Sequence, residues 1–141
     1  MGTEIFLDTS FAIAPSSSKD RHHVQAIGIA DRLHADRNPL ITTRAVCLEI
    51  GNSLAKQRFR SAARQLLTSL ESDSNVTIEP LTEELFADGL KLFQSRSDKD
   101  WGLTDCISFV VMQNRGIIDA LTADKHFQQV GFRALLLESS V

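Results

Sequence analysis

Short apolar runs alternate along this chain with longer segments that have helical periodicity. The runs predict five buried strands, at residues 5–7, 40–43, 76–80, 117–121 and 133–137. The segments between them predict a helical stub and six helices, at 11–15, 20–37, 45–56, 60–70, 82–93, 103–115 and 124–130. Strands that alternate with helices favour a parallel sheet covered on both faces. We therefore expect an α/β fold, a three-layer α/β/α sandwich with a central, mainly parallel sheet of four to five strands.

Two helical segments carry clear packing signals. In the segment that begins near Asp20, a candidate N-cap, apolar residues recur at every third position, which predicts one buried face; they are Val24, Ile27, Ala30 and Leu33. The segment at 103–115 is apolar on two sides, so we expect it to pack centrally and to end at Gly116.

Composition limits the class of protein. The 141 residues are 43% hydrophobic and 23% charged, which is ordinary for one globular domain and excludes a disordered tail, a collagen-like repeat and a coiled coil. We expect a single domain over 1–141, without a secretion signal or a membrane span, in the cytoplasm. Cys47 and Cys106 are too few for a zinc site or a disulfide scaffold, and they are interpreted as small buried hydrophobes.

Carboxylates lie near the predicted strand ends. Asp8 follows the first strand directly, and Asp124 lies three residues after the fourth. Glu49 lies on the helix after the second strand, and Asp105 begins the helix before the fourth. Ligands of open parallel sheets bind beyond the carboxyl ends of the strands, where like charges need a counter-ion. An all-carboxylate site suits a hard cation such as Mg²⁺ or Mn²⁺.

A structural interpretation of the same residues stays open. Asp8, Asp105 and Asp124 could each cap a helix, and Glu49 could be a solvated surface charge. The histidines offer no clear ligand set: His22 and His23 are adjacent and point in different directions on a helix, and His34 and His126 are isolated. We expect these histidines to be surface residues.

Charge is unevenly distributed along the chain. The net charge is −3, yet the stretch from Ile50 to Leu70 has no acid and four bases, namely Lys56, Arg58, Arg60 and Arg64. A local basic surface is therefore expected on an otherwise acidic protein.

Four blocks of sequence resemble the motifs of PIN-domain ribonucleases, in order and over essentially the whole chain. They are Leu7-Asp8-Thr9-Ser10 with Asp20-x-x-His23, Glu49-Ile50-Gly51-Asn52, Leu103-Thr104-Asp105-Cys106-Ile107-Ser108, and Leu121-Thr122-Ala123-Asp124-Lys125-His126-Phe127 followed by Gly131-Phe132. The last two blocks are the most specific. The match is closest to small single-domain members, which include the VapC-type toxins of toxin–antitoxin pairs.

The resemblance implies a Mg²⁺- or Mn²⁺-dependent endoribonuclease. Asp8, Glu49, Asp105 and Asp124 would be the catalytic acids, with Asp8, Asp105 and Asp124 as direct metal ligands and Glu49 binding directly or through water. Thr9, Ser10, Asn52 and Thr104 would orient the carboxylates. An antitoxin protein is a further expected partner. The charge pattern, independently of the resemblance, predicts that the basic residues at 56–64 contact the RNA backbone, with a solvated helical face as the alternative.

The resemblance also implies a twofold dimer. Its expected surface combines residues 10–33 with parts of the 83–93 helix.

Two other functions are open at this point. A phosphatase of the haloacid-dehalogenase type would use Asp8 as its nucleophile, but such enzymes need a second aspartate two residues later, where this chain has Ser10. A non-catalytic α/β binding module would use the acids only as helix caps.

Overall fold

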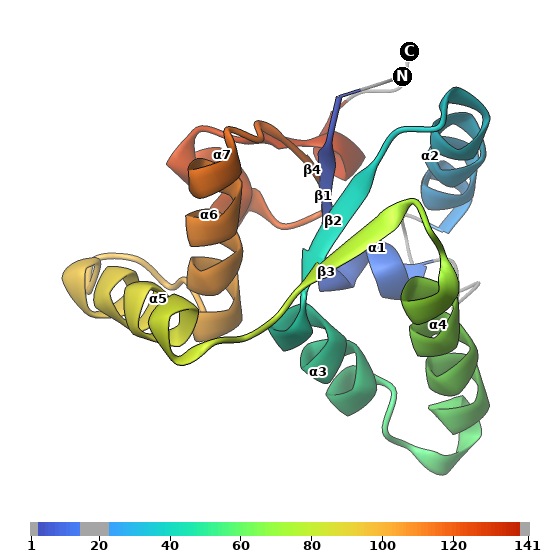
Figure 1. Cartoon of the computed structure of the whole chain (residues 1–141), viewed down its shortest axis with the longest axis horizontal. Coiled ribbons are helices and arrows are strands. Elements are labelled where there is room, and N and C mark those ends of the chain that lie inside the picture. The colour runs from blue at the N-terminus through green and yellow to red at the C-terminus, as the bar shows by residue number, and fades with distance from the viewer. Residues whose placement is uncertain (1–2, 15–22, 139–141) are drawn as a thin grey trace.

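Five parallel strands form one sheet in the order β3–β2–β1–β4–β5 (Figure 1). The computed structural model describes residues 3–14 and 23–138, so the predicted N-cap at Asp20 lies outside the described residues. The strands are β1 (Ile5–Leu7), β2 (Leu40–Thr43), β3 (Val76–Glu79), β4 (Asp119–Leu121) and β5 (Arg133–Ala134). Because all strand pairs are parallel, their carboxyl ends share one edge of the sheet.

Helices cover both faces of this sheet. In Figure 1, α5 and α6 lie on one side of the strands, α2 and α4 lie on the other, and α3 begins where β2 ends. The helices are α1 (Thr9–Ile13), α2 (His23–Asp36), α3 (Arg44–Ser53), α4 (Arg60–Ser72), α5 (Glu83–Ser95), α6 (Leu103–Arg115) and α7 (Lys125–Val130). The predicted three-layer α/β/α sandwich is confirmed.

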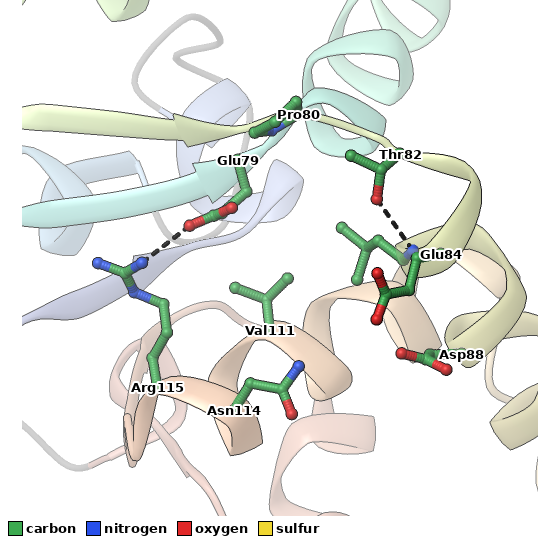
Figure 2. A pocket seen from close by; sticks show the side chains of 9 residues that line it. Glu79, Pro80, Thr82, Glu84, Asp88, Val111, Asn114 and Arg115 are labelled. Atoms are coloured by element: carbon green, nitrogen blue, oxygen red, sulfur yellow. Dashed lines mark hydrogen bonds and ion pairs between the residues drawn. The ribbon is translucent and has the colours of Figure 1, made fainter.

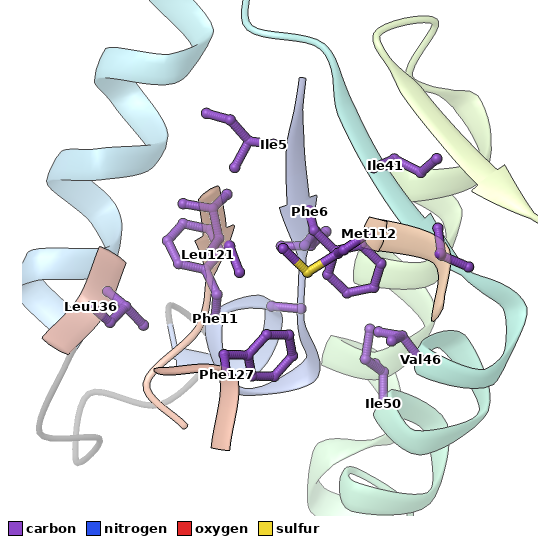
Figure 3. Close-up of a cluster of buried hydrophobic side chains, with 14 of the residues drawn as sticks. Ile5, Phe6, Phe11, Ile41, Val46, Ile50, Met112, Leu121, Phe127 and Leu136 are labelled. Carbon is purple, nitrogen blue, oxygen red and sulfur yellow. The ribbon is translucent and has the colours of Figure 1, made fainter. Parts of the chain in front are cut away.

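The core joins the central strands to the helices of both layers. Figure 3 shows Phe6 of β1 beside Met112 of α6, with Val46 and Ile50 of α3 below them and Phe127 of α7 near the same cluster. All five of these side chains are fully buried. Burial of each stabilises the fold by roughly 1.5–3 kcal/mol relative to exposure. The predicted central position of α6 is confirmed.

Buried threonines fix the carboxyl ends of the strands. Thr42 Oγ1 donates to the Leu7 carbonyl at 2.7 Å, and Thr43 Oγ1 accepts from Val46 N at 3.0 Å as the N-cap of α3. Both threonines are completely buried. Because these hydroxyls satisfy backbone groups at the sheet edge, the chain can turn directly from β2 into α3 without leaving unpaired polar atoms.

The predicted buried face of α2 is half correct: Ala30 and Leu33 are partly buried and pack against the core, but Val24 and Ile27 do not. Val24 is 80% exposed and Ile27 40%, while Ala26 and Ile29 are buried. An α-helix turns by 100° per residue, so a strict spacing of three drifts by about 60° at each step and cannot stay on one face. The observed face follows the 3.6-residue period instead.

Other boundaries differ from the prediction by a few residues. β4 begins at Asp119 instead of Ile117, and β5 ends at Ala134 because Leu135–Leu137 form a 3₁₀ turn. α3 ends at Ser53, which leaves Lys56 in the loop that leads to α4. Cys47 and Cys106 are free and buried, as expected.

The expected dimer surface stays a prediction, and its residues 15–22 lie outside the described residues. α2 and α5 lie on opposite sides of the sheet (Figure 1), so these two helices do not share one face. Among residues 3–14 and 23–138, no helix has the length and apolar character needed to cross a membrane.

Two glycines give a paired test of the helix packing. A Cβ at Gly89 of α5 would lie 2.5 Å from Cγ1 of Ile107 on α6, whereas one at Gly28 of α2 would have no atom within 4 Å. Gly89→Ala should therefore lower the free energy of unfolding by about 1–3 kcal/mol through overpacking. Gly28→Ala, the control, should raise it by about 1 kcal/mol through helix propensity. Urea unfolding measures both, and a Gly89→Ala protein as stable as the wild type would contradict the close α5–α6 contact.

Candidate metal centre and nucleic-acid interface

Asp8 is buried at the point where β1 ends. Its backbone N–H donates to the Leu121 carbonyl of β4 at 3.1 Å, and its side chain is 3% exposed. Oδ2 of this carboxylate accepts hydrogen bonds from Ser10 Oγ at 3.0 Å and from Thr122 Oγ1 at 2.7 Å. Both hydroxyls thus occupy the same oxygen of Asp8.

The two hydroxyls also hold the loop that follows β4. Ser10 Oγ accepts from Ala123 N at 3.0 Å, and Thr122 Oγ1 accepts from Asp124 N at 3.0 Å. The segments after β1 and β4 are therefore bound to each other through Asp8. Sequence reasoning gave Thr122 no role, although it lies in the fourth motif, directly after a strand and two residues before Asp124.

Burial opposes ionisation of Asp8. It raises the pKa of this carboxyl to about 6, chiefly by desolvation, with a further contribution from the negative charge of Asp105. The hydrogen bonds from Thr122 and Ser10 lower the pKa, but they do not offset burial. A cation bound here would relieve the cost of the buried charge.

Asp105 and Asp124 meet beside His126. One oxygen of each carboxylate and a ring nitrogen of the histidine all lie within 4.8 Å of one another, and all three residues are half-buried. His126 Nδ1 is 3.3 Å from Asp105 Oδ2 and 3.2 Å from Asp124 Oδ1. Burial raises the pKa of Asp105, and so does the charge of Asp124, while the hydrogen bond with His126 lowers it.

The expectation that His126 is an isolated surface residue is wrong. Its side chain is 21% exposed and lies between two of the predicted catalytic acids. Because Asp105 is 21 residues away in the sequence, on another helix, no local pattern could have indicated this contact.

Glu49 lies beside this group and not within it. It is half-buried on α3 and lines a groove of about 280 Å³ with Asn52, Leu103 and Thr104. Thr104 precedes Asp105, so the groove leads from Glu49 to the start of α6. The sheet edge thus brings Asp105 into electrostatic contact with both Asp8 and Asp124. Glu49 shares its groove with Thr104, the residue before Asp105.

The other predicted orienting groups differ in their contacts. Ser10 bonds directly to Asp8, as described above. Thr9 Oγ1 is a buried hydroxyl oxygen without a hydrogen-bond partner within the described part of the chain. Asn52 is exposed and Thr104 half-buried, both on the groove with Glu49. Their orienting role stays a prediction.

Helix capping accounts for part of this arrangement. Asp124 Oδ1 accepts from His126 N at 2.8 Å and caps α7, and Asp105 Oδ2 accepts weakly from Gly102 N at 3.4 Å. Asp8 stands at the N-cap of α1, but its side chain makes no capping bond. Capping therefore does not explain why a carboxylate is buried at this position.

The chemistry of these donors fits a hard divalent cation. Three carboxylates come together here, and burial raises the pKa of two of them, Asp8 and Asp105. Mg²⁺ and Mn²⁺ prefer oxygen ligands. On Asp8, both hydroxyl bonds fall on the same oxygen, Oδ2.

The basic residues lie next to this region. Arg60 and Arg64 of α4 line a groove of about 710 Å³ against α3, which also includes Asn52. Asn52 therefore lines both this groove and the one that holds Glu49. The guanidinium of Arg58 lies 4.8 Å from the ring centroid of Phe59, and Lys56 and Arg58 do not line the groove.

Several other arginines are already neutralised by carboxylates. Figure 2 shows Arg115 of α6 directed toward Glu79 of β3. Its Nη1 donates to Glu79 Oε1 at 2.8 Å, and both residues line a pocket of about 200 Å³. Arg115 also pairs with Glu4, and Arg133 pairs with Asp119 and Glu138. Within the described residues, by contrast, no ion pair involves any of the four bases at 56–64. The charge of these bases is therefore available to an anionic partner.

Comparison with known proteins identifies the family. A family model described as the PIN domain matches residues 5–133. The chain belongs to the PIN domain family. The haloacid-dehalogenase alternative is therefore wrong. Ser10, which stands where such a phosphatase needs its second aspartate, donates a hydrogen bond to Asp8 instead.

Relatives within the PIN family are known by sequence and by structure. Over 128 residues the chain is 28% identical to the 23S rRNA-specific endonuclease VapC20 of Mycobacterium tuberculosis, in strains CDC 1551 and H37Rv, which covers 91% of this chain and 95% of the relative. The crystal structure of the Mycobacterium tuberculosis VapC20, a Sarcin-Ricin loop cleaving toxin, matches with a TM-score of 0.79 and 27% identity, over 92% of this chain and 96% of the other.

The buried carboxyl of Asp8 predicts a pH dependence of stability without metal. Its pKa of about 6, against 3.8 ordinarily, means that the folded state holds this proton more tightly than the unfolded state. The free energy of unfolding should thus fall as pH rises from about 4 to about 6 and stay low above that. Asp8→Asn should remove most of this slope and raise stability at pH 7 by about 3 kcal/mol.

Urea unfolding in EDTA between pH 4 and 7.5 measures this effect. The exposed Asp31 of α2 provides the control, since Asp31→Asn should leave the slope unchanged. The pKa of Asp105 is also raised, so a smaller pH dependence of the free energy of unfolding, with the same sign, should remain in every variant. Parallel curves for the wild type and Asp8→Asn would contradict the assignment of the pH dependence to Asp8.

Proposed function

We propose that this PIN domain protein is an endoribonuclease that hydrolyses RNA phosphodiester bonds with Mg²⁺ or Mn²⁺, and that the whole chain acts as one domain. The observation that carries the proposal is the convergence of buried Asp8 with Asp105 and Asp124 at the carboxyl edge of the sheet. The similarity to a 23S rRNA-specific endonuclease supports the same activity.

The carboxylates have distinct roles in this proposal. Asp8, Asp105 and Asp124 hold the cation, and Glu49 acts from across its groove, directly or through water. Ser10 and Thr122 fix the orientation of Asp8 through Oδ2. A cation held by these carboxylates would supply a hydroxide nucleophile near neutral pH and would offset the charge that develops on the phosphoryl oxygens. Because the protein side of the site is anionic, RNA must be held by charges elsewhere.

The similarity also suggests a substrate and partners. We propose ribosomal RNA as the first substrate class to test, because the curated relative is named for 23S rRNA and its structure for the sarcin–ricin loop. A toxin of this kind would be controlled by an antitoxin protein. Self-association as a twofold dimer stays a prediction, with a surface other than the combined α2 and α5 helices.

Removing the Asp8 charge should abolish catalysis and preserve the fold. Asp8→Asn should lower metal-dependent cleavage of purified 23S rRNA by about 100-fold or more, since a ligand and its charge are lost. Asp31→Asn, the same change on an exposed face, should cleave like the wild type. Cleavage is followed on denaturing gels with Mg²⁺, Mn²⁺ or EDTA. Undiminished cleavage by Asp8→Asn would remove Asp8 from the site, and no cleavage by the wild type with either metal would contradict the proposed activity.

We further propose that the α3–α4 groove holds the RNA backbone through Arg60 and Arg64, with Lys56 and Arg58 at its margin. The groove shares Asn52 with the groove of Glu49, so a strand along it would reach the acidic centre. Positive charge here would offset the repulsion between RNA phosphates and the carboxylates.

A salt series tests this groove. In the inactive Asp8→Asn background, Arg60→Ala with Arg64→Ala should weaken RNA binding and lower the salt slope by roughly 0.7 for each phosphate that the protein no longer neutralises. Arg32→Ala on α2, where the side chain is also exposed, is the matched control and should change neither value. Fluorescence anisotropy across a series of salt concentrations measures both. An unchanged slope in the double variant would place the RNA elsewhere.

A further inference from the structure

We propose that His126 is a positioning residue that holds the carboxylates of Asp105 and Asp124 at a metal-binding separation before a cation arrives. It does so as a hydrogen-bond donor and is not itself a metal ligand. This inference rests on the proposed function, because it takes these two carboxylates as part of the metal site.

The position of the ring nitrogen carries the argument. Nδ1 lies 3.3 Å from Asp105 Oδ2 and 3.2 Å from Asp124 Oδ1, between two carboxylates that repel each other. A nitrogen lone pair directed at either oxygen would add to this repulsion, whereas an N–H would be attracted to both. We therefore infer that Nδ1 carries a proton, which a neutral imidazole provides in one of its two tautomers.

The histidine is itself fixed by one of its partners. Its backbone N–H donates to Asp124 Oδ1 at 2.8 Å at the first turn of α7. The same Oδ1 of Asp124 lies 3.2 Å from ring Nδ1 as an electrostatic contact, while Nδ1 makes its hydrogen bond with Asp105 Oδ2, which also receives the long bond from Gly102 N. The hydrogen bonds fall on one oxygen of each carboxylate, Oδ2 of Asp105 and Oδ1 of Asp124. The other oxygen of each is left to a cation.

This arrangement prepares the site for its ligand. Without His126, the repulsion between Asp105 and Asp124 would drive the two side chains apart, and a cation would have to bring them together again. Hydrogen-bond partners of metal ligands commonly contribute about 10- to 100-fold to metal affinity. A donor that bridges both ligands should lie within this range.

Three substitutions at this position distinguish loss of the hydrogen-bond donor from loss of the imidazole ring. In His126→Asn the side-chain amide N–H₂ can occupy the place of Nδ1, whereas in His126→Gln the longer side chain carries the same amide beyond it. His126→Leu removes the donor altogether. His34→Leu changes an exposed histidine on α2 and is the matched control.

Binding of Mn²⁺ without RNA is the measurement, followed by the electron paramagnetic resonance of free Mn²⁺. We expect the Gln and Leu variants to bind Mn²⁺ about 10-fold more weakly or worse, with Asn and the His34 control close to the wild type. Spin-echo spectra of the bound Mn²⁺ should show no nitrogen coordinated to the ion. Urea unfolding without metal confirms that each variant is folded. If Gln and Leu fail to fold, the Asn affinity and the wild-type spin-echo spectrum decide.

Several results would overturn the inference. They are unchanged affinity in folded Gln and Leu variants, an Asn variant as weak as Gln, or a nitrogen ligand on the wild-type Mn²⁺. Failure of the proposed function looks different: Mn²⁺ binds and depends on His126, yet no RNA is cleaved. A wild type that binds no Mn²⁺ would overturn both.

Discussion

The buried carboxylate of Asp8 is the constraint on which the rest of the site depends. An ionised carboxyl cannot be placed at the end of a buried strand without partners, and here two hydroxyls from distant segments provide them. These hydroxyls also bond to the backbone of residues 123 and 124. Solvating one charge therefore joins the ends of β1 and β4, and it fixes the backbone of Asp124 close to Asp8 through Thr122.

The acids of this site are held in two different ways. Asp8 is fixed by neutral hydroxyls in a fully buried place, and its charge is costly there. Asp105 and Asp124 are half-buried and share His126, so their repulsion is reduced by one bridging group. Both arrangements leave oxygens free to face a cation. The carboxylates repel one another, and a bound divalent ion would relieve this repulsion. Loss of one carboxylate should therefore lower the affinity for metal and raise the stability of the metal-free protein.

Acidic and basic side chains occupy neighbouring parts of this surface. The acidic centre lies at the sheet edge, and Arg60 and Arg64 of α4 line the next groove, with Asn52 common to both grooves. Four other arginines are each paired with a carboxylate, namely Arg44, Arg96, Arg115 and Arg133. A protein of net charge −3 can thus present a local positive surface to a polyanion, because the stretch from Ile50 to Leu70 carries four bases and no acid.

The sequence by itself determined the order of strands and helices and the place of Asp8 and Asp124 at the ends of their strands. Apolar runs such as Ile5–Leu7 mark strands, and in a parallel sheet every residue that follows a strand comes to the same edge, so Asp8 and Asp124 could be placed together without coordinates. Only the tertiary structure decided that Val24 faces solvent, that Thr122 bonds to Asp8 across 114 positions, and that His126 lies between Asp105 and Asp124. It also decided which arginines pair with carboxylates. Local periodicity reports the backbone conformation of one segment, whereas these contacts depend on the distance and orientation between segments, and those are fixed only when the core packs.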